Sequence, residues 1–198
     1  MSLELVNTFA TLGTFSVIAA TAIAAIVQLR HMRGSNQIVA LNELRETTET
    51  AEFRAAQLFV QTELSSKLRD PAFRYQVANA AARTEENKSL IAKAMMIGNF
   101  YEGMGVLVKN GLVEAELAIA MWWWLATNFW EILSPFTAIA RRVRGATGWE
   151  NFEYLTVLSQ DWAAAHPEGS YPARKRRLVV KDEWREADRQ YEASLARA

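Results

Sequence analysis

VNTFATLGTFSVIAATAIAAIVQL, residues 6–29, contains no charged side chain and is followed directly by Arg30, His31 and Arg33. As an α-helix that rises about 1.5 Å per residue it would extend roughly 36 Å, whereas the hydrocarbon core of a bilayer is about 30 Å thick. The stretch therefore predicts a single transmembrane helix over residues 6–29, with membrane lipids as its surroundings.

Two other interpretations of this stretch stay open. A cleaved signal peptide has a positive N-terminal region, but this chain has Glu4 and no Lys or Arg before residue 30. A buried core helix is the second alternative, although a charge-free run of this length is unusual at the start of a chain. If the stretch is an anchor, Arg30 and Arg33 place the N-terminus outside the inner membrane and residues 30–198 in the cytoplasm.

Small side chains line one side of the predicted span. Ser16, Ala20 and Ala24 follow one another in steps of four, a spacing that lets a second helix approach closely. The alternative interpretation is ordinary alanine-rich composition. We predict that these residues pack against another helix.

Composition limits the classes of function that remain. Apolar residues make up 51% of the 198 residues and charged residues 22%, which is typical of a packed globular domain. The formal net charge of zero argues against a general nucleic-acid binder. The chain has no Cys and only two His residues, His31 and His166, far apart in sequence. We therefore predict no cofactor and no metal site.

The pattern after residue 29 predicts an all-α fold, a bundle of about five or six helices. Gly34 and Ser35 form a weak break, and the polar run at residues 46–50 marks a turn. Asp70-Pro71 predicts a helix start, with Asp as N-cap and Pro at the first helical position. The predicted segments are an external N-terminus (1–5), the transmembrane helix (6–29), a juxtamembrane helix or linker (30–50), the helical domain (51–166), and a basic linker with an amphipathic helix (167–198).

Residues 87–109 carry the clearest helical pattern. A heptad seam of apolar residues predicts a helix that packs against partner helices: Leu90, Ala94, Ile97, Tyr101, Met104 and Val108. A parallel stripe places Glu102 between Gly98 and Gly105, two glycines that allow close packing. Gly111 is expected to end the helix in a left-handed conformation.

Within residues 112–133, the run between Glu116 and Glu131 contains no charged residue and includes Trp122, Trp123 and Trp124. A buried core helix is the favoured interpretation, and a helix lying at the membrane interface or a second span are the alternatives. Because three consecutive residues point in three directions, at least one of these Trp side chains should meet solvent, lipid or a partner. Ser134-Pro135 predicts a new helix start, and Thr147 with Glu150 predicts a capping box.

Glu102 and Glu131 are the acidic residues with a distinctive setting, because both lie in apolar surroundings. We predict a buried polar network in which Glu102 pairs with Arg141 or Arg144, with Glu131 and the Trp130 N–H nearby, since a buried charge requires a partner. The functional alternative is a polar site of an enzyme or effector around Glu102 and Arg141. A diiron site is not expected, because the chain has no Glu-x-x-His motif.

The C-terminal region contains a basic cluster, Arg174, Lys175, Arg176 and Arg177. Together with Arg30 and Arg33 it is predicted to contact anionic lipid, at about 1 kcal/mol per charge near the surface. A solvated charged linker is the alternative for residues 174–177. A narrow apolar stripe on a charge-rich helix then runs from Val180 to Leu195.

Three segments carry a resemblance to a known family: EFRAAQLF at 52–59, NFYEGMGVLVKNGLVE at 99–114 and FWEILSPFTAIARRVR at 129–144. The chain resembles, over about residues 8–165, a bacterial family of single-span, membrane-anchored, all-helical proteins classed as a domain of unknown function. The matching residues are Phe100, Glu102, residues 105–111, Trp130, Pro135 and Arg141. The resemblance implies the architecture and no activity, substrate or cofactor.

These patterns contain no catalytic motif and favour a non-enzymatic interaction or oligomerisation module at the inner face of the membrane. It would associate with itself or with a membrane protein through the span, the Trp-rich helix and the tail. The alternatives are the enzyme or effector already described, and a subunit of an envelope or transport complex.

Overall fold

The predicted all-α class is confirmed by a computed structural model that describes residues 3–195, which contain helices and no strand. The helices are α1 (Leu3–Glu49), α2 (Ala51–Thr62), α3 (Leu64–Lys67), α4 (Pro71–Ala78), a short 3-10 helix η1 (Ala80–Ala82), α5 (Glu85–Lys109), α6 (Ala115–Arg144), α7 (Glu150–Ala165) and α8 (Arg185–Leu195). They form two compact units, Met1–Pro167 and Glu168–Ala198, which are described separately. The predicted N-terminal segment 1–5 and the end of the tail lie partly outside the described residues.

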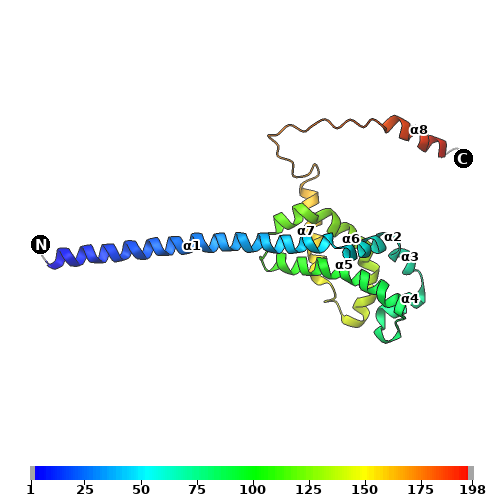
Figure 1. Cartoon of the computed structure of the whole chain (residues 1–198), viewed down its shortest axis with the longest axis horizontal. Coiled ribbons are helices and arrows are strands. Elements are labelled where there is room, and N and C mark those ends of the chain that lie inside the picture. Colours follow the sequence, from blue (N-terminus) through cyan, green and yellow to red (C-terminus); the bar gives the residue numbers. More distant parts are fainter. Residues whose placement is uncertain (1–2, 196–198) are drawn as a thin grey trace. The chain divides into compact units, whose positions relative to one another are not determined.

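α1 is one uninterrupted helix (Figure 1). Among the described residues it is the one helix long and apolar enough to cross a membrane, and none of its apolar window is buried. The predicted break at Gly34 and Ser35 is wrong, since the helix continues through both residues to Glu49. A single interior glycine costs a helix only about 1 kcal/mol, which neighbouring turns readily offset.

The C-terminal part of α1 packs on the helical domain. Leu41 is buried, and Ala40 and Leu44 lie against the core. Arg33 Nη2 donates a hydrogen bond to the Gly111 carbonyl at 3.0 Å. The helix ends in the predicted turn, where the Thr50 hydroxyl caps α2. The apolar helix thus enters the domain directly, without a flexible linker.

The predicted start at Asp70-Pro71 is confirmed. Asp70 Oδ1 accepts the Ala72 N–H at 2.8 Å, and Pro71 occupies the first helical position of α4. α2 turns Phe53, Phe59 and other apolar residues toward the core. These local signals hold because the caps satisfy backbone groups that a helix end leaves without partners.

α5 lies at the centre of the domain, in contact with α2, α6 and α7. It begins at Glu85, earlier than expected, because Thr84 caps it. The predicted heptad seam is confirmed, since its members from Ala94 to Val108 are buried and Leu90 is partly buried. Burial raises the pKa of the Tyr101 hydroxyl above its ordinary value, so the ring stays uncharged in the core. Gly111, with φ of 65°, ends the helix as predicted.

α6 runs through Pro135, so the predicted helix start at Ser134-Pro135 is wrong. Proline lacks the N–H that would bond the Glu131 carbonyl four residues earlier. Glu131 and Pro135 both lie on the exposed side of α6, where water can hydrate that carbonyl. Leu133 and Phe136 are buried on the opposite side and keep the helix against the core.

The C-terminal unit contains α8, of which no described residue is buried. Arg177 stacks over the Tyr171 ring at 5.0 Å and donates a hydrogen bond to the Glu168 carbonyl at 2.7 Å. The side chains of the apolar residues Leu178, Val179 and Val180 are exposed. The role predicted for this tail in binding lipid stays a prediction.

Candidate functional site

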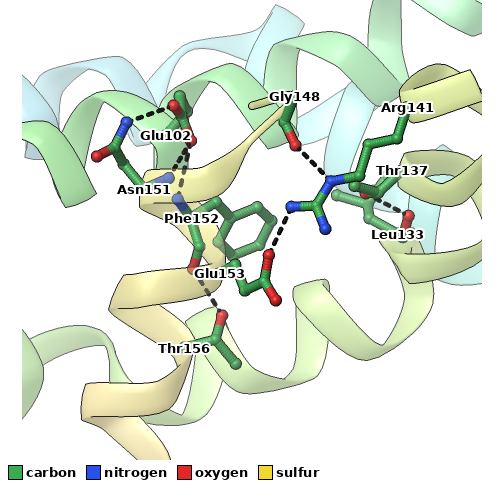
Figure 2. A network of polar contacts seen from close by, with 9 residues as sticks. All are labelled: Glu102, Leu133, Thr137, Arg141, Gly148, Asn151, Phe152, Glu153 and Thr156. Carbon is green, nitrogen blue, oxygen red and sulfur yellow. Dashed lines mark hydrogen bonds and ion pairs between the residues drawn. The ribbon is translucent and has the colours of Figure 1, made fainter. Parts of the chain in front are cut away.

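Glu102 of α5 caps the N-terminus of α7 (Figure 2). Its Oε2 accepts the backbone N–H groups of Asn151 at 3.0 Å and Phe152 at 2.8 Å, and its Oε1 accepts Asn151 Nδ2 at 2.7 Å. These are the backbone donors that an N-cap side chain normally satisfies, and the carboxylate also suits the positive end of the helix dipole. A side chain from a different helix therefore closes the end of α7.

Gly98 and Gly105, about one turn before and one turn after Glu102, allow the N-terminus of α7 to approach α5 closely. A β-carbon at Gly105 would overlap with the backbone carbonyl of Asn151, and one at Gly98 would overlap with the Trp149 ring. The predicted packing role of Gly98 and Gly105 is therefore carried out within the chain, where both receive the first turn of α7.

Trp149 precedes α7 in a left-handed conformation, with φ of 54° and ψ of 40°. It is the N-cap residue, but its side chain makes no capping bond. The predicted capping box of Thr147 and Glu150 is therefore wrong. Glu102 supplies the acceptor that this box would have provided, because the loop brings the helix end onto α5.

Arg141 supports the same turn from α6. Its Nε donates to the Gly148 carbonyl at 2.8 Å, and its Nη2 bonds Glu153 Oε2 at 2.6 Å (Figure 2). The guanidinium also lies over the Trp130 ring at 5.8 Å. Glu102 and Arg141 thus bind neighbouring parts of the loop and helix from residue 148 to residue 153.

The predicted pairing of Glu102 with Arg141 or Arg144 is wrong. Glu102 accepts hydrogen bonds from backbone and side-chain amide groups of α7, and Arg141 forms an ion pair with Glu153. Glu131 lies on the exposed side of α6, and Arg144 forms no ion pair with any described residue. Trp130 is partly buried and packs edge-on against Phe152, with ring centroids 5.1 Å apart.

A cavity of about 370 Å³ lies between α4, α5, the last turns of α6 and the loop before α7. Trp149 and Gly148 line it, but neither Glu102 nor Arg141 does. A reactive site around Glu102 and Arg141 would need both side chains to reach one solvent-accessible space. Their bonds to α7 and to the loop before it give Glu102 and Arg141 a structural role. The alternative prediction of an enzyme or effector site around these two residues therefore gains no support.

Sequence reasoning missed Trp149, Asn151 and Asn99. The Trp149 indole N–H donates to Asn99 Oδ1 at 2.9 Å, and Asn151 Oδ1 accepts from Lys109 at 3.2 Å. The spacing of Gly98, Glu102 and Gly105 was a signal for this contact. Two glycines that flank a hydrogen-bond acceptor indicate that another segment of the chain packs closely there.

The other predicted contact residues lie apart from this site. Ser16, Ala20 and Ala24 are exposed along α1, and Arg30 is exposed just beyond the apolar run. Arg33 contacts Gly111, as described above. The cluster at residues 174–177 is exposed in the C-terminal unit.

The three adjacent Trp residues of α6 have three environments, as expected. Trp122 is buried, Trp123 is half-buried beside Trp162 with ring centroids 5.8 Å apart, and Trp124 is 57% exposed. Met121 and Leu117, one and two turns earlier respectively, are exposed on the same side as Trp124. This part of α6 is therefore a core helix that also presents an apolar surface.

The structure defines an all-α protein with a long apolar N-terminal helix and a domain whose α7 is capped by a carboxylate from α5. Residues 15–159 match the model of the family described as a domain of unknown function, DUF4760, and the chain belongs to that family. No curated protein and no solved structure matches it. The predicted resemblance to a family of unknown function is confirmed.

Proposed function

We propose that the protein is a single-pass protein of the inner membrane and a non-enzymatic interaction module. It would self-associate through one side of α1, here called the free face, which carries Gly13, Ser16, Ala20, Ala24 and Gly34. Its N-terminus would lie outside and its helical domain in the cytoplasm. The charges support this orientation, because residues 1–29 contain no Lys or Arg while Arg30 and Arg33 follow the apolar run.

Two glycines in α1 carry the proposal. A β-carbon at Gly13 or at Gly34 would meet no atom within 4 Å. An interior glycine costs a helix about 1 kcal/mol relative to alanine, and at Gly98 and Gly105 the chain itself uses the space. At Gly13 and Gly34 no described residue uses it. Small residues of this kind let the backbones of two membrane helices come close together.

Both glycines lie on the same face as the predicted small residues. At about 100° per residue, Gly13, Ser16, Ala20, Ala24 and Gly34 fall within a sector of roughly 80°. The exposed Ile38 lies in the same sector, beyond the apolar run. A free face that continues past the lipid boundary is what an extended contact between two copies of α1 requires.

The C-terminal part of α1 contacts the domain on a neighbouring side. Arg33, Ala40 and Leu44 lie about 120–160° from the centre of the free face, but the buried Leu41 lies only about 60° from it. Two α1 helices can therefore meet without displacing either domain along the part of the free face from Gly13 to Ala24, whose residues are exposed.

Cysteine cross-linking tests self-association, since the chain has no native Cys. We expect Ile38→Cys to form a disulfide-linked dimer in membranes after mild oxidation. Ala20→Leu with Ala24→Leu should lower the cross-linked fraction by roughly tenfold, because added methylenes in a packed contact cost about 1–3 kcal/mol.

Ala22→Leu with Ala25→Leu is the matched control, because these residues lie about 140–160° from the centre of the free face. It adds the same apolar volume and should leave the cross-linked fraction unchanged. If both double variants behave alike, or if Ile38→Cys stays monomeric, then α1 is an anchor without self-association.

The basic cluster supports a second contact with the membrane. A chain lacking residues 1–29 should bind vesicles containing anionic lipid at least tenfold more tightly than neutral vesicles, given about 1 kcal/mol per basic residue. Changing residues 174–177 to Gln should remove that difference, and raised salt should weaken binding. Vesicle sedimentation measures both effects, and equal binding to the two vesicle types would identify the cluster as a solvated linker.

A further inference from the structure

Trp149 is held in a conformation that bulky side chains rarely adopt. Among the described residues it is the one non-glycine residue with positive φ. Its indole N–H bonds Asn99 Oδ1 at 2.9 Å, and its ring stacks on Phe136 with centroids 5.7 Å apart and planes 18° apart. The absent side chain of Gly98 gives the ring its space. Strained residues fixed by several contacts are common at ligand sites.

The cavity that Trp149 lines has the size of a small-molecule site. Its volume of about 370 Å³ is within the range of about 300–1,000 Å³ that is typical of such pockets. Val77, Met95, Phe136 and Val143 supply apolar wall beside Trp149. A compact apolar group would be removed from water there.

The charged residues in the cavity wall have one sign. Of the described residues that line it, Arg83 and Arg144 are basic and none is acidic. Arg83 is held in place because its Nε and Nη2 donate to the carbonyls of Gln76 at 3.0 Å and Val77 at 3.2 Å. Arg144 pairs with no described carboxylate, in contrast to Arg141, which pairs with Glu153.

We propose that this cavity binds a small molecule with one carboxylate or phosphate group and a compact apolar body. Arg144 and Arg83 would hold the anionic group, because a guanidinium matches the geometry of either anion. The apolar wall around Trp149 would cover the body. Asn99, with its Oδ1 already bonded to Trp149, adds an amide donor at the same wall.

A soluble ligand fits the position of the cavity better than a lipid headgroup does. The cavity adjoins the C-terminal end of α6, whereas Arg33 contacts Gly111, just before its N-terminal end. Those ends are about 45 Å apart along a helix of this length. The proposal is also independent of whether α1 self-associates.

Calorimetric titration of the full chain in nanodiscs of zwitterionic lipid tests the proposal, with empty nanodiscs as the blank. The probes are 1-naphthoate, the uncharged 1-naphthalenemethanol, and inorganic phosphate. We expect saturable one-to-one binding of 1-naphthoate. The affinity for each of the other two probes should be at least roughly tenfold lower than that for 1-naphthoate.

Arg144→Gln should weaken 1-naphthoate binding by about tenfold or more. Arg142→Gln is the matched control, because it removes a charge from the same last turn of α6 at a residue that does not line the cavity. Ala140→Phe should fill the cavity and abolish binding, with thermal unfolding confirming that each variant is folded. The proposal is overturned if millimolar 1-naphthoate does not bind, if the two arginine variants bind alike, or if the alcohol or phosphate binds as tightly.

Discussion

Gly105→Ala is expected to lower the melting temperature of the domain by roughly 2–12 °C. The new β-carbon would overlap with the Asn151 carbonyl, which belongs to the backbone and has no alternative rotamer. α7 would have to move away from α5, and overpacking of this kind costs about 1–3 kcal/mol. For a protein of this size, each 1 kcal/mol corresponds to about 2–4 °C.

Gly103→Ala is the matched control for that change. Gly103 lies on the same helix, is exposed, and would place its β-carbon in open space. Alanine should therefore stabilise α5 by up to about 1 kcal/mol through its higher helix propensity. Thermal unfolding followed by circular dichroism should show opposite signs for the two variants. Shifts of the same sign and size would mean that the close approach at Gly105 does not matter.

The elements that could be predicted from sequence are those decided by neighbouring residues. The heptad seam of α5, the Asp70 cap and the glycine end at Gly111 depend on side chains within a few positions of the feature. Their free energies are local, so the pattern alone is enough to place them.

The errors arise where tertiary packing overrides a local signal. Pro135 indicates a helix start, but its exposed side tolerates the missing hydrogen bond while Leu133 and Phe136 hold the helix in the core. Thr147 and Glu150 match the pattern of a capping box. Trp149 nevertheless takes a left-handed conformation, and Glu102 caps the N-terminus of α7.

The partner of Glu102 could not be predicted for a related reason. Sequence shows that a carboxylate in apolar surroundings requires donors, and Arg141 is a suitable one. Whether the Glu102 carboxylate binds a guanidinium or backbone N–H groups depends on where residues 145–149 place the N-terminus of α7. Nothing local encodes that position, although Gly98 and Gly105 indicate close approach.

Glu102→Ala should destabilise the domain by about 2–3 kcal/mol, which corresponds to roughly 4–12 °C in melting temperature. The variant leaves without their acceptor the N–H groups of Asn151, which is partly buried, and Phe152, which is buried. Glu131→Gln is the matched control, because it removes an exposed carboxylate from α6 and should change stability by less than about 0.5 kcal/mol.

Hydrogen exchange distinguishes the loss of a cap from general destabilisation. In Glu102→Ala the amides of Asn151 and Phe152 should exchange faster under native conditions, whereas the centre of α5 should change only by the global loss in stability. Unchanged protection of the first turn of α7 would contradict the capping role.

Glu102→Gln separates the geometry of the cap from its charge. A glutamine oxygen can still accept both backbone N–H groups, but its NH₂ group would face the Asn151 amide, which donates to Glu102 in the native chain. A flip of Asn151 would relieve that conflict and give up the bond from Lys109 to Asn151 Oδ1. We therefore expect about half of the loss seen in Glu102→Ala. A loss equal to that of the alanine variant would show that the negative charge at the helix N-terminus, rather than the position of the acceptor, stabilises this junction.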